Sequence, residues 1–263
     1  MRQWKSSFFI VAAFALAAAP VAGIAGVCDI AWDGDKLVAA IAGRPSYLRV
    51  PLRDKLQNIS EVSVDQIQAF NEAKEKIAKL AGSSPSFLIC GDAAPNAFAS
   101  KGNNGNVVGV TIGMLRLVDG DRGMAAAVLG HEFAHLTHNH GEVGAGRDAL
   151  IGIAGLIFGM VVDVRSQQRT GVPTNVGQTI GQIGSTLVSR KFSRDQEREA
   201  DDTGFQYLIA AGFDPNGAVR LSERLNRLGG GAGLFFDSHP GWEERSERFR
   251  VMIAGNVQAQ QGV

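Results

Sequence analysis

The sequence predicts an α+β fold that is mostly helical, with a small sheet packed beside the helix that contains residues 131–135. Two observations support this fold class. Apolar residues recur at helical spacing in several long segments, and three short runs typical of strands lie within residues 86–112. The length of 263 residues is enough for one domain with a sizeable core. The formal net charge of zero gives no electrostatic reason to expect a nucleic-acid partner.

The first 25 residues have the layout of a signal peptide. Arg2 and Lys5 precede an apolar run over residues 8–19, which is too short for a comfortable membrane span. We therefore expect a leader at 1–25 that is cleaved, and a protein that is periplasmic or secreted. Lipidation at Cys28 and an uncleaved anchor are the alternatives.

The rest of the chain divides into three predicted parts. Glycine and proline interrupt residues 26–62, so we expect this N-terminal segment to be irregular. The main domain is predicted over residues 63–254, with a glycine-rich insertion at 141–192. Residues 255–263 are expected to form a C-terminal tail.

The main domain is predicted to begin with a helix followed by the sheet. Ser63 and Gln66 are spaced as a capping box, and apolar residues follow at helical spacing as far as Leu80. Short strands are then predicted at 86–90, 96–99 and 107–112. After residue 193, helices are predicted to begin at Ser193, at Asp214 and near Trp242, the last two ending at about Leu228 and Ala254.

Residues 131–135 carry the most informative motif, His-Glu-Phe-Ala-His. Residues four apart on a helix lie on one face, so His131 and His135 present two imidazoles to the same point. Such a pair suits a tetrahedral zinc ion. Glu132 reaches the rim of the same site, where it can take a proton from a water molecule that zinc activates. The chemistry this implies is hydrolysis of a peptide bond.

The motif is predicted to lie on a helix. An alanine-rich segment without proline precedes it, Asp119 or Asp121 can cap the N-terminus, and Gly141 suits the position after the C-terminus. His138 lies too far along the helix axis to share one ion with both motif histidines. His140 is expected to face the opposite side and to be solvated.

A third protein ligand is expected from the helix that begins at Ser193. Glu197 and Asp201 are four apart and share a face of this helix, whereas Glu199 points away from them. We therefore predict that Glu197 binds the metal and that Asp201 accepts a hydrogen bond from a ligand imidazole. Gly204 continues this face and would let another helix approach closely. The alternative, for this segment taken alone, is an ordinary charged helix.

Together the two motifs resemble those of zinc metallopeptidases of the HtpX and CAAX prenyl protease type, peptidase family M48, and in particular its soluble periplasmic members. The resemblance covers roughly residues 60–253. It implies a gluzincin-like zinc metallopeptidase domain with one Zn²⁺ per chain. The resemblance makes His131, His135 and Glu197 the ligands and Glu132 the catalytic base.

Two weaker matches extend this resemblance. Residues 96–99 resemble the edge strand that binds substrate in gluzincins; they are Asn96, Ala97, Phe98 and Ala99. His239 resembles a histidine that sits over the metal in the periplasmic members, which makes it a candidate regulatory zinc ligand. Glycines at 229–233 would let it move in and out of the site. The simpler alternative for His239 is a surface residue that precedes a helix.

Two further features leave alternatives open. Cys28 and Cys90 are the two cysteines of the chain, and they either form a disulfide or leave Cys90 as a buried free thiol. Within the insertion, residues 149–163 are apolar, glycine-rich and too short to span a bilayer. This segment is either a buried or partner-covered helix, or a lid over the cleft that makes peripheral contact with a membrane.

The expected function is that of a secreted zinc-dependent endopeptidase acting on unfolded or misassembled envelope proteins. Its partners would be a polypeptide substrate and outer-membrane or envelope assembly proteins, with no nucleic acid. The competing class is a zinc-dependent, chaperone-like assembly factor with little turnover, and a third class is a peptidase kept latent by a partner or its own lid. All three need the same cleft, so a turnover assay is required to separate them.

Overall fold

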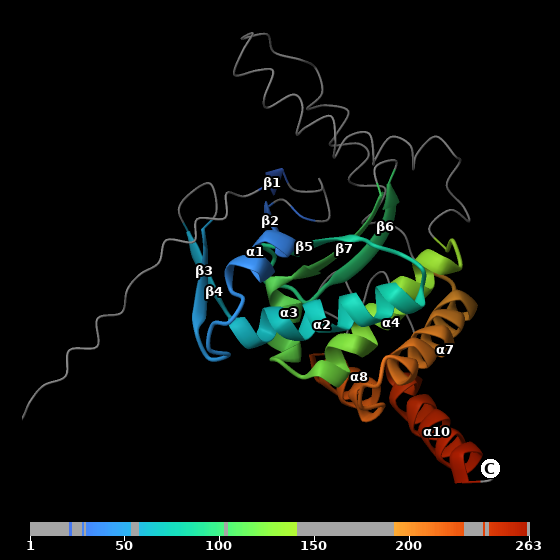
Figure 1. Cartoon of the computed structure of the whole chain (residues 1–263). Coiled ribbons are helices and arrows are strands. Elements are labelled where there is room, and N and C mark those ends of the chain that lie inside the picture. The colour runs from blue at the N-terminus through green and yellow to red at the C-terminus, as the bar shows by residue number, and fades with distance from the viewer. Residues whose placement is uncertain are drawn as a thin grey trace, which may run out of the picture.

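The computed structural model describes residues 21–22, 28, 30–53, 58–102, 105–140, 192–228, 239 and 242–261. Within these ranges the chain forms a mostly helical α+β fold with one small main sheet, as the sequence predicts (Figure 1). The helices gather on one face and at one end of this sheet. The site described below lies where these helices meet the sheet.

The main sheet has five strands in the order β1-β2-β5-β7-β6. Their bounds are Val21–Ala22 for β1, Ile30–Asp33 for β2, Ser86–Cys90 for β5, Ala97–Gly102 for β6 and Gly105–Thr111 for β7. β5 and β7 are parallel, and the other neighbours are antiparallel. Among the described strands, none pairs with the outer edge of β6. The backbone groups along that edge are therefore the natural place for another strand to add.

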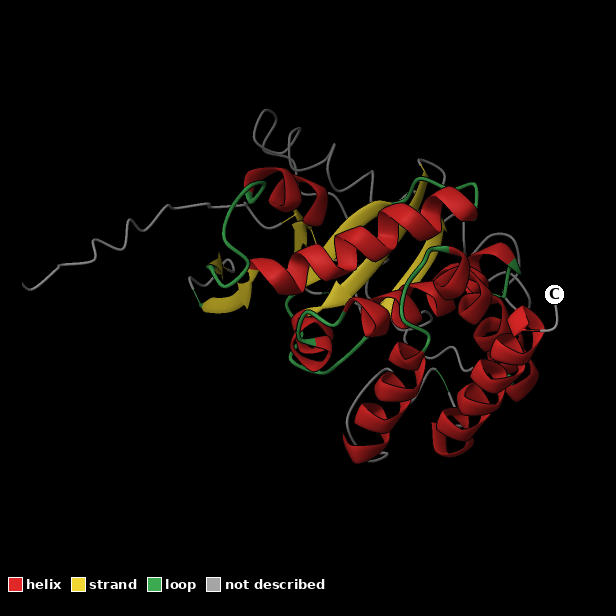
Figure 2. Ribbon diagram, turned by 60° about the horizontal axis from the view of Figure 1, so that its bottom comes forward, coloured by secondary structure: helices red, strands yellow, loops and turns green. Residues whose placement is uncertain are grey.

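The helix α2 (Val64–Leu80) lies across one face of this sheet (Figure 2). The predicted capping box is present, since Ser63 accepts from the Gln66 N–H at 3.1 Å and Gln66 accepts from the Ser63 N–H at 2.8 Å. The predicted apolar stripe is buried; its largest members are Ile67, Phe70 and Ile77, all with no exposed surface. Burial of each such side chain stabilises the fold by about 1.5–3 kcal/mol.

The helix α4 (Arg122–Thr137) lies at the centre of the helical part. It contacts α2, α7 (Arg194–Ala210), α8 (Asn216–Leu228) and strand β6, while α10 (Trp242–Gln261) packs on α8. A short helix, α3 (Ile112–Val118), connects the sheet to α4. Every side chain that α4 directs inward is thus enclosed by neighbours from both halves of the chain.

The expectation that residues 26–62 are irregular is wrong. This segment contains β2, a helix α1 (Gly34–Ala40) and an antiparallel pair of strands, β3 (Arg49–Arg53) and β4 (Ile59–Ser63). The glycine and proline do not break these elements. Gly34 begins α1 where a Cβ would come within 2.4 Å of the Phe87 ring, and Pro51 lies in a two-stranded sheet, where a missing N–H is tolerated.

The C-terminal helix is longer than predicted. α10 runs to Gln261 instead of ending near Ala254, so most of the expected tail at 255–263 is helical. Gly255 is exposed and a Cβ there would meet nothing within 4 Å. A solvent-facing glycine costs a helix only about 1 kcal/mol, and the residues after it include good helix formers.

The two cysteines form a disulfide. Cys28 lies just before β2 and Cys90 ends β5, with their Cα atoms 5.3 Å apart. Both side chains are buried. The covalent link joins the N-terminal segment to the middle of the main sheet, and the alternative of a free thiol at Cys90 is excluded.

Several sequence-based expectations concern residues outside the described ranges. These are the greater part of the predicted leader 1–25, the insertion at 141–192 except for Phe192, the apolar segment 149–163 and the glycines at 229–233. The short strand β1 falls within the predicted leader and pairs with β2. In the ranges that are described, no helix combines the length and the hydropathy that a membrane span requires.

Candidate metal centre

The helix α4 positions the two motif histidines. Asp121, rather than Asp119, caps its N-terminus by accepting a hydrogen bond from the Met124 N–H at 3.0 Å. Asp119 instead ends α3 in a left-handed conformation. His131 and His135 both lie on the enclosed face of α4, and each is 4% exposed.

The helix α7 crosses α4 at a point where both helices carry glycine. A Cβ on Gly130 would lie 2.6 Å from the Gly204 carbonyl oxygen, and a Cβ on Gly204 would lie 2.6 Å from the His131 nitrogen. The prediction that Gly204 permits a close helix approach is therefore confirmed. This contact brings Glu197 and Asp201 of α7 against the histidines of α4.

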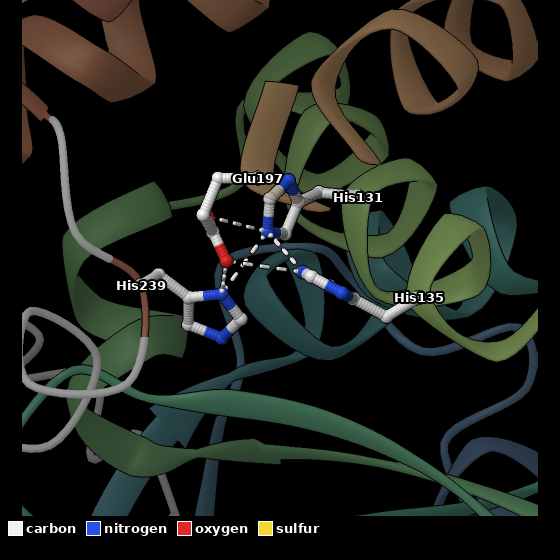
Figure 3. Close-up of side chains that lie close together, drawn as sticks. All are labelled: His131, His135, Glu197 and His239. Atoms are coloured by element: carbon white, nitrogen blue, oxygen red, sulfur yellow. Dashed lines mark hydrogen bonds and ion pairs between the residues drawn. The ribbon is translucent and has the colours of Figure 1, made fainter. Parts of the chain in front are cut away.

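Four ligand atoms converge between these helices (Figure 3). His131 Nε2 lies 2.9 Å from His135 Nε2, and both nitrogens lie 3.4 Å from an oxygen of Glu197. His239 Nδ1 lies 2.9 Å from Glu197 Oε1 and 3.1 Å from His131 Nε2. Ligand atoms of a tetrahedral zinc ion with bonds of about 2.05 Å are separated by about 3.3 Å. The donor set and its spacing thus fit zinc.

Asp201 and Arg245 orient the ligands from the side away from the cluster. His131 Nδ1 lies 3.0 Å from Asp201 Oδ1, on the side of the ring opposite the cluster. The Arg245 guanidinium, from α10, donates to Glu197 Oε2 at 3.2 Å and also to Asp201. Arg245 is only 5% exposed and joins the two carboxylates. The role of Arg245 follows from these contacts and requires the structure.

Glu132 is close to the cluster but is not one of the four converging residues. It is 3% exposed, and its Oε1 makes no hydrogen bond and lies 3.6 Å from His239 Nε2. Burial raises the pKa of Glu132 to about 7, although His239 and the backbone N–H of Ala99 act against this shift. A buried carboxyl group with this pKa can both accept and release a proton near neutral pH.

Electrostatics favour a charged Glu197 beside neutral imidazoles at His131 and His135. Burial acts to raise the pKa of Glu197, but the electrostatic interaction with His131 and hydrogen bonds with His135 and His239 outweigh it and lower that pKa well below its usual value. Burial lowers the pKa of both His131 and His135. An ionised carboxylate and unprotonated imidazoles are the forms that bind a metal ion.

The predicted substrate strand is present with a shifted boundary. β6 begins at Ala97, and Asn96 lies just before it, buried, with its N–H donating to Thr111 Oγ1 at 2.9 Å. The Phe98 ring lies over Gly109, where a Cβ would come within 2.3 Å of it. Ala99 directs its backbone N–H at Glu132. The sheet edge therefore passes directly beside the candidate base.

The expectation that His140 is solvated is wrong. His140 is 6% exposed, and its Nδ1 lies 2.9 Å from His135 Nδ1. The helix ends at Thr137, so extrapolating its phase to residue 140 places the side chain incorrectly. The sequence does not predict that Phe192 belongs to the site. Its half-buried ring stacks on His135 with ring centroids 4.0 Å apart.

The arrangement of fold and site defines a class of protein. A central helix with two histidines and an adjacent glutamate, a second helix with a converging glutamate, and a sheet edge beside them are the parts of a zinc metallopeptidase domain. Residues 65–253 match the profile of Peptidase family M48, and the chain belongs to this family.

The chain is also similar to individual metalloproteases. Metalloprotease LoiP of Escherichia coli K12 is 31% identical over 132 residues, and Metalloprotease YcaL of the same organism is 34% identical over 136 residues. The chain spans about half the length of each, 49% and 48%. A Protease HtpX homolog of Methylibium petroleiphilum is 25% identical over 231 residues, which are 77% of this chain and 81% of that protein. The family uses zinc, and the His-His-Glu-His site provides for it here.

Proposed function

We propose that this chain is a zinc endopeptidase, with His131, His135 and Glu197 as zinc ligands and Glu132 as the general base. The observation that carries the proposal is the convergence of the three ligand atoms beside a buried glutamate that is left out of the cluster. Zinc, when bound, polarises the scissile carbonyl and lowers the pKa of water towards about 7. Glu132 takes the proton of the attacking water and delivers it to the leaving amine.

The edge of β6 is the proposed substrate site. An extended polypeptide that pairs with β6 lies beside Glu132, since the Ala99 N–H already reaches this carboxylate. Main-chain hydrogen bonds supply affinity with little sequence demand. This mode of binding suits unfolded polypeptides, and unfolded or misassembled envelope proteins of a periplasmic or secreted enzyme are the substrates we propose.

The proposal is tested with the purified full chain, an unfolded envelope protein and a chelator control. Glu132→Gln keeps the shape of the site but removes the base, so we expect about one zinc per chain and a rate at least about 100-fold lower, the range that general-base catalysis spans. Cleavage by Glu132→Gln at the wild-type rate would contradict the assigned mechanism. A wild-type chain that binds zinc and unfolded protein but yields no fragments would favour the chaperone-like assembly factor instead.

A latent enzyme is the second candidate, and His239 favours it. His239 is 3% exposed, and its Nδ1 completes the group of four ligand atoms. A zinc ion held by four protein ligands has no open position for water. We propose that this closed arrangement is inhibited and that His239 leaves the cluster when substrate enters.

A further inference from the structure

The chain turns sharply after α4 and folds back over it. The His140 N–H donates to the His135 carbonyl at 3.0 Å, and the Asn139 N–H approaches the Leu136 carbonyl at 3.3 Å. Asn139 has a left-handed conformation, with φ of 57°. These are the two hydrogen bonds of a Schellman motif, in which asparagine is a common left-handed residue after glycine. The turn places the His140 ring directly against the His135 ring.

His140 connects a proposed zinc ligand to a carboxylate. Its Nδ1 lies 2.9 Å from His135 Nδ1, and its Nε2 lies 3.0 Å from Glu199 Oε2. His140 is 6% exposed, whereas the Glu199 side chain is 54% exposed. Neither residue takes part in the mechanism given above. The three groups form a chain of hydrogen bonds that leads from the metal centre to the surface.

The direction of each hydrogen bond follows from one assignment. His135 Nε2 faces the cluster, so a neutral His135 that binds zinc there must carry its proton on Nδ1 and donate it to His140 Nδ1. His140 Nδ1 must then be unprotonated, which puts the His140 proton on Nε2. That nitrogen donates to Glu199, an acceptor when ionised. Every proton has one consistent position.

We propose that His140 and Glu199 are positioning residues that fix the tautomer and ring orientation of His135, an inference that rests on the proposed zinc site. Asp201 does the same for His131 by direct contact at 3.0 Å. His135 has no such carboxylate within reach of Nδ1 among the described contacts, and His140 fills that place. Partners of this kind make an imidazole a stronger metal ligand.

A second metal site is the competing interpretation of the same residues. His138, His140 and Glu199 bring three potential ligand atoms within 4.8 Å of one another. Binding there would require an unprotonated His140 Nε2, and the proton would move to Nδ1, where it would face the proton of His135 Nδ1. A zinc-bound His135 therefore disfavours a second ion. His138 lies 2.8 Å from Thr203 and 3.2 Å from Glu199 Oε1, the carboxylate oxygen that His140 does not contact.

Zinc affinity of the full chain, measured by competition with a chromophoric chelator, tests the proposal. We expect His140→Ala to weaken zinc binding about 10- to 100-fold. His140→Asn should recover most of the loss, because its Oδ1 takes the place of Nδ1 as acceptor. Glu199→Ala should cause a smaller loss, since water can reach this exposed end of the chain. The matched control is His138→Ala, which lies in the same turn without contacting a ligand and should bind zinc like the wild type.

Three results would overturn the proposal. The first is wild-type affinity in His140→Ala. The second is equal loss in His140→Ala and His140→Asn with a lowered melting temperature of the metal-free chain, which would show a purely structural role. The third is two zinc ions per wild-type chain that fall to one in His138→Ala, which would establish the second metal site. Equal zinc affinity of the wild type and His140→Ala would refute the role of His140 but leave the peptidase proposal intact. A wild-type chain without zinc affinity would refute both the role of His140 and the peptidase proposal.

Discussion

Glu197 and Glu199 are two residues apart on one helix and have different surroundings. Glu197 is 3% exposed and faces the cluster, whereas Glu199 reaches His138 and His140 beyond it. We expect Glu197→Ala to lose stoichiometric zinc during dialysis against a moderate chelator, because it removes a ligand and one of the two carboxylates that Arg245 joins. Glu199→Ala should retain zinc under the same conditions. Metal analysis of the two dialysed variants measures the zinc that each retains. Zinc retained by Glu197→Ala and lost by Glu199→Ala would mean that the ligand is misassigned.

His239 is predicted to be a zinc ligand in the closed state. X-ray absorption at the metal edge of the substrate-free chain should show one nitrogen neighbour fewer in His239→Ala than in the wild type. The His138→Ala variant is the control and should match the wild type. Basal proteolysis should rise in His239→Ala, because an open position becomes available to water. An unchanged nitrogen count would refute the role of His239 as a ligand, regardless of activity.

At the scale of residues, helical phase was a reliable guide only inside helices. It placed Glu197 and Asp201 on the metal-facing side of α7, and the structure brings both to the cluster. It failed at His140, which lies three residues beyond the last residue of α4. The left-handed residue that ends α4 is Asn139, whereas the sequence favoured Gly141, which is outside the described residues. The roles of Arg245 and Phe192 depend on contacts between distant segments, and spacing carries no information about them.

At the scale of elements, the contact between α4 and α7 depends on paired glycines. A Cβ on residue 204 would overlap the backbone of α4, 2.6 Å from the His131 nitrogen. We expect Gly204→Ala to destabilise the fold by about 1–3 kcal/mol and to lower zinc affinity, because the helices must separate. Thermal unfolding and chelator competition measure the two effects. Gly212→Ala is an unsuitable control because its φ is 77°, so Gly255→Ala on the exposed face of α10 serves instead and should be neutral or stabilising.

The N-terminus of α4 is tied to the loop before α8 by Arg220. This side chain donates to Asp121 at 2.7 and 2.9 Å and to Asp214 at 2.7 Å. Burial acts to raise the pKa of Asp121, but the Arg220 and Met124 hydrogen bonds outweigh it and lower that pKa below 3.8. The ion pairs are partly exposed, so we expect Arg220→Gln to cost about 1 kcal/mol at neutral pH.

The sign of the pH dependence follows from the lowered pKa. Asp121 stabilises the fold fully above its unfolded-state value of about 3.9, and this contribution disappears as the pH falls through the lower folded value. The difference in melting temperature between wild type and Arg220→Gln should therefore be constant from about pH 7 to pH 5 and shrink below pH 4. A difference that grew on acidification would contradict the assignment.

Long elements with many periodic residues were predicted well, and the short elements before residue 63 were not. The capping boxes at Ser63 and Ser193 mark α2 and α7, and both are present with their reciprocal hydrogen bonds. The N-terminal elements β2, α1, β3 and β4 have four to seven residues each, which is too few to establish a period. Tertiary pairing, such as that of β2 with β5, stabilises them, and a single sequence does not reveal it.

At the scale of the whole molecule, the fold class could be predicted and the topology could not. The zinc motif and the strands before it indicate a helical domain with a small sheet. The parallel pairing of β5 with β7, with β6 returning outside β7, depends on how the chain between them closes. The disulfide was one of two open alternatives, because two cysteines 62 residues apart in sequence carry no geometric information until β2 and β5 pair.

The residues of the metal centre are far apart in the sequence, so they are synthesised at different times. Arg245, which contacts both Glu197 and Asp201, follows His131 by 114 residues. A chain that emerges from the ribosome N-terminus first carries both motif histidines long before it carries the residue that orients Glu197. On the proposed function, hydrolytic activity therefore appears only when α10 has docked. On this proposal, the protease is inactive while its own chain is still being synthesised.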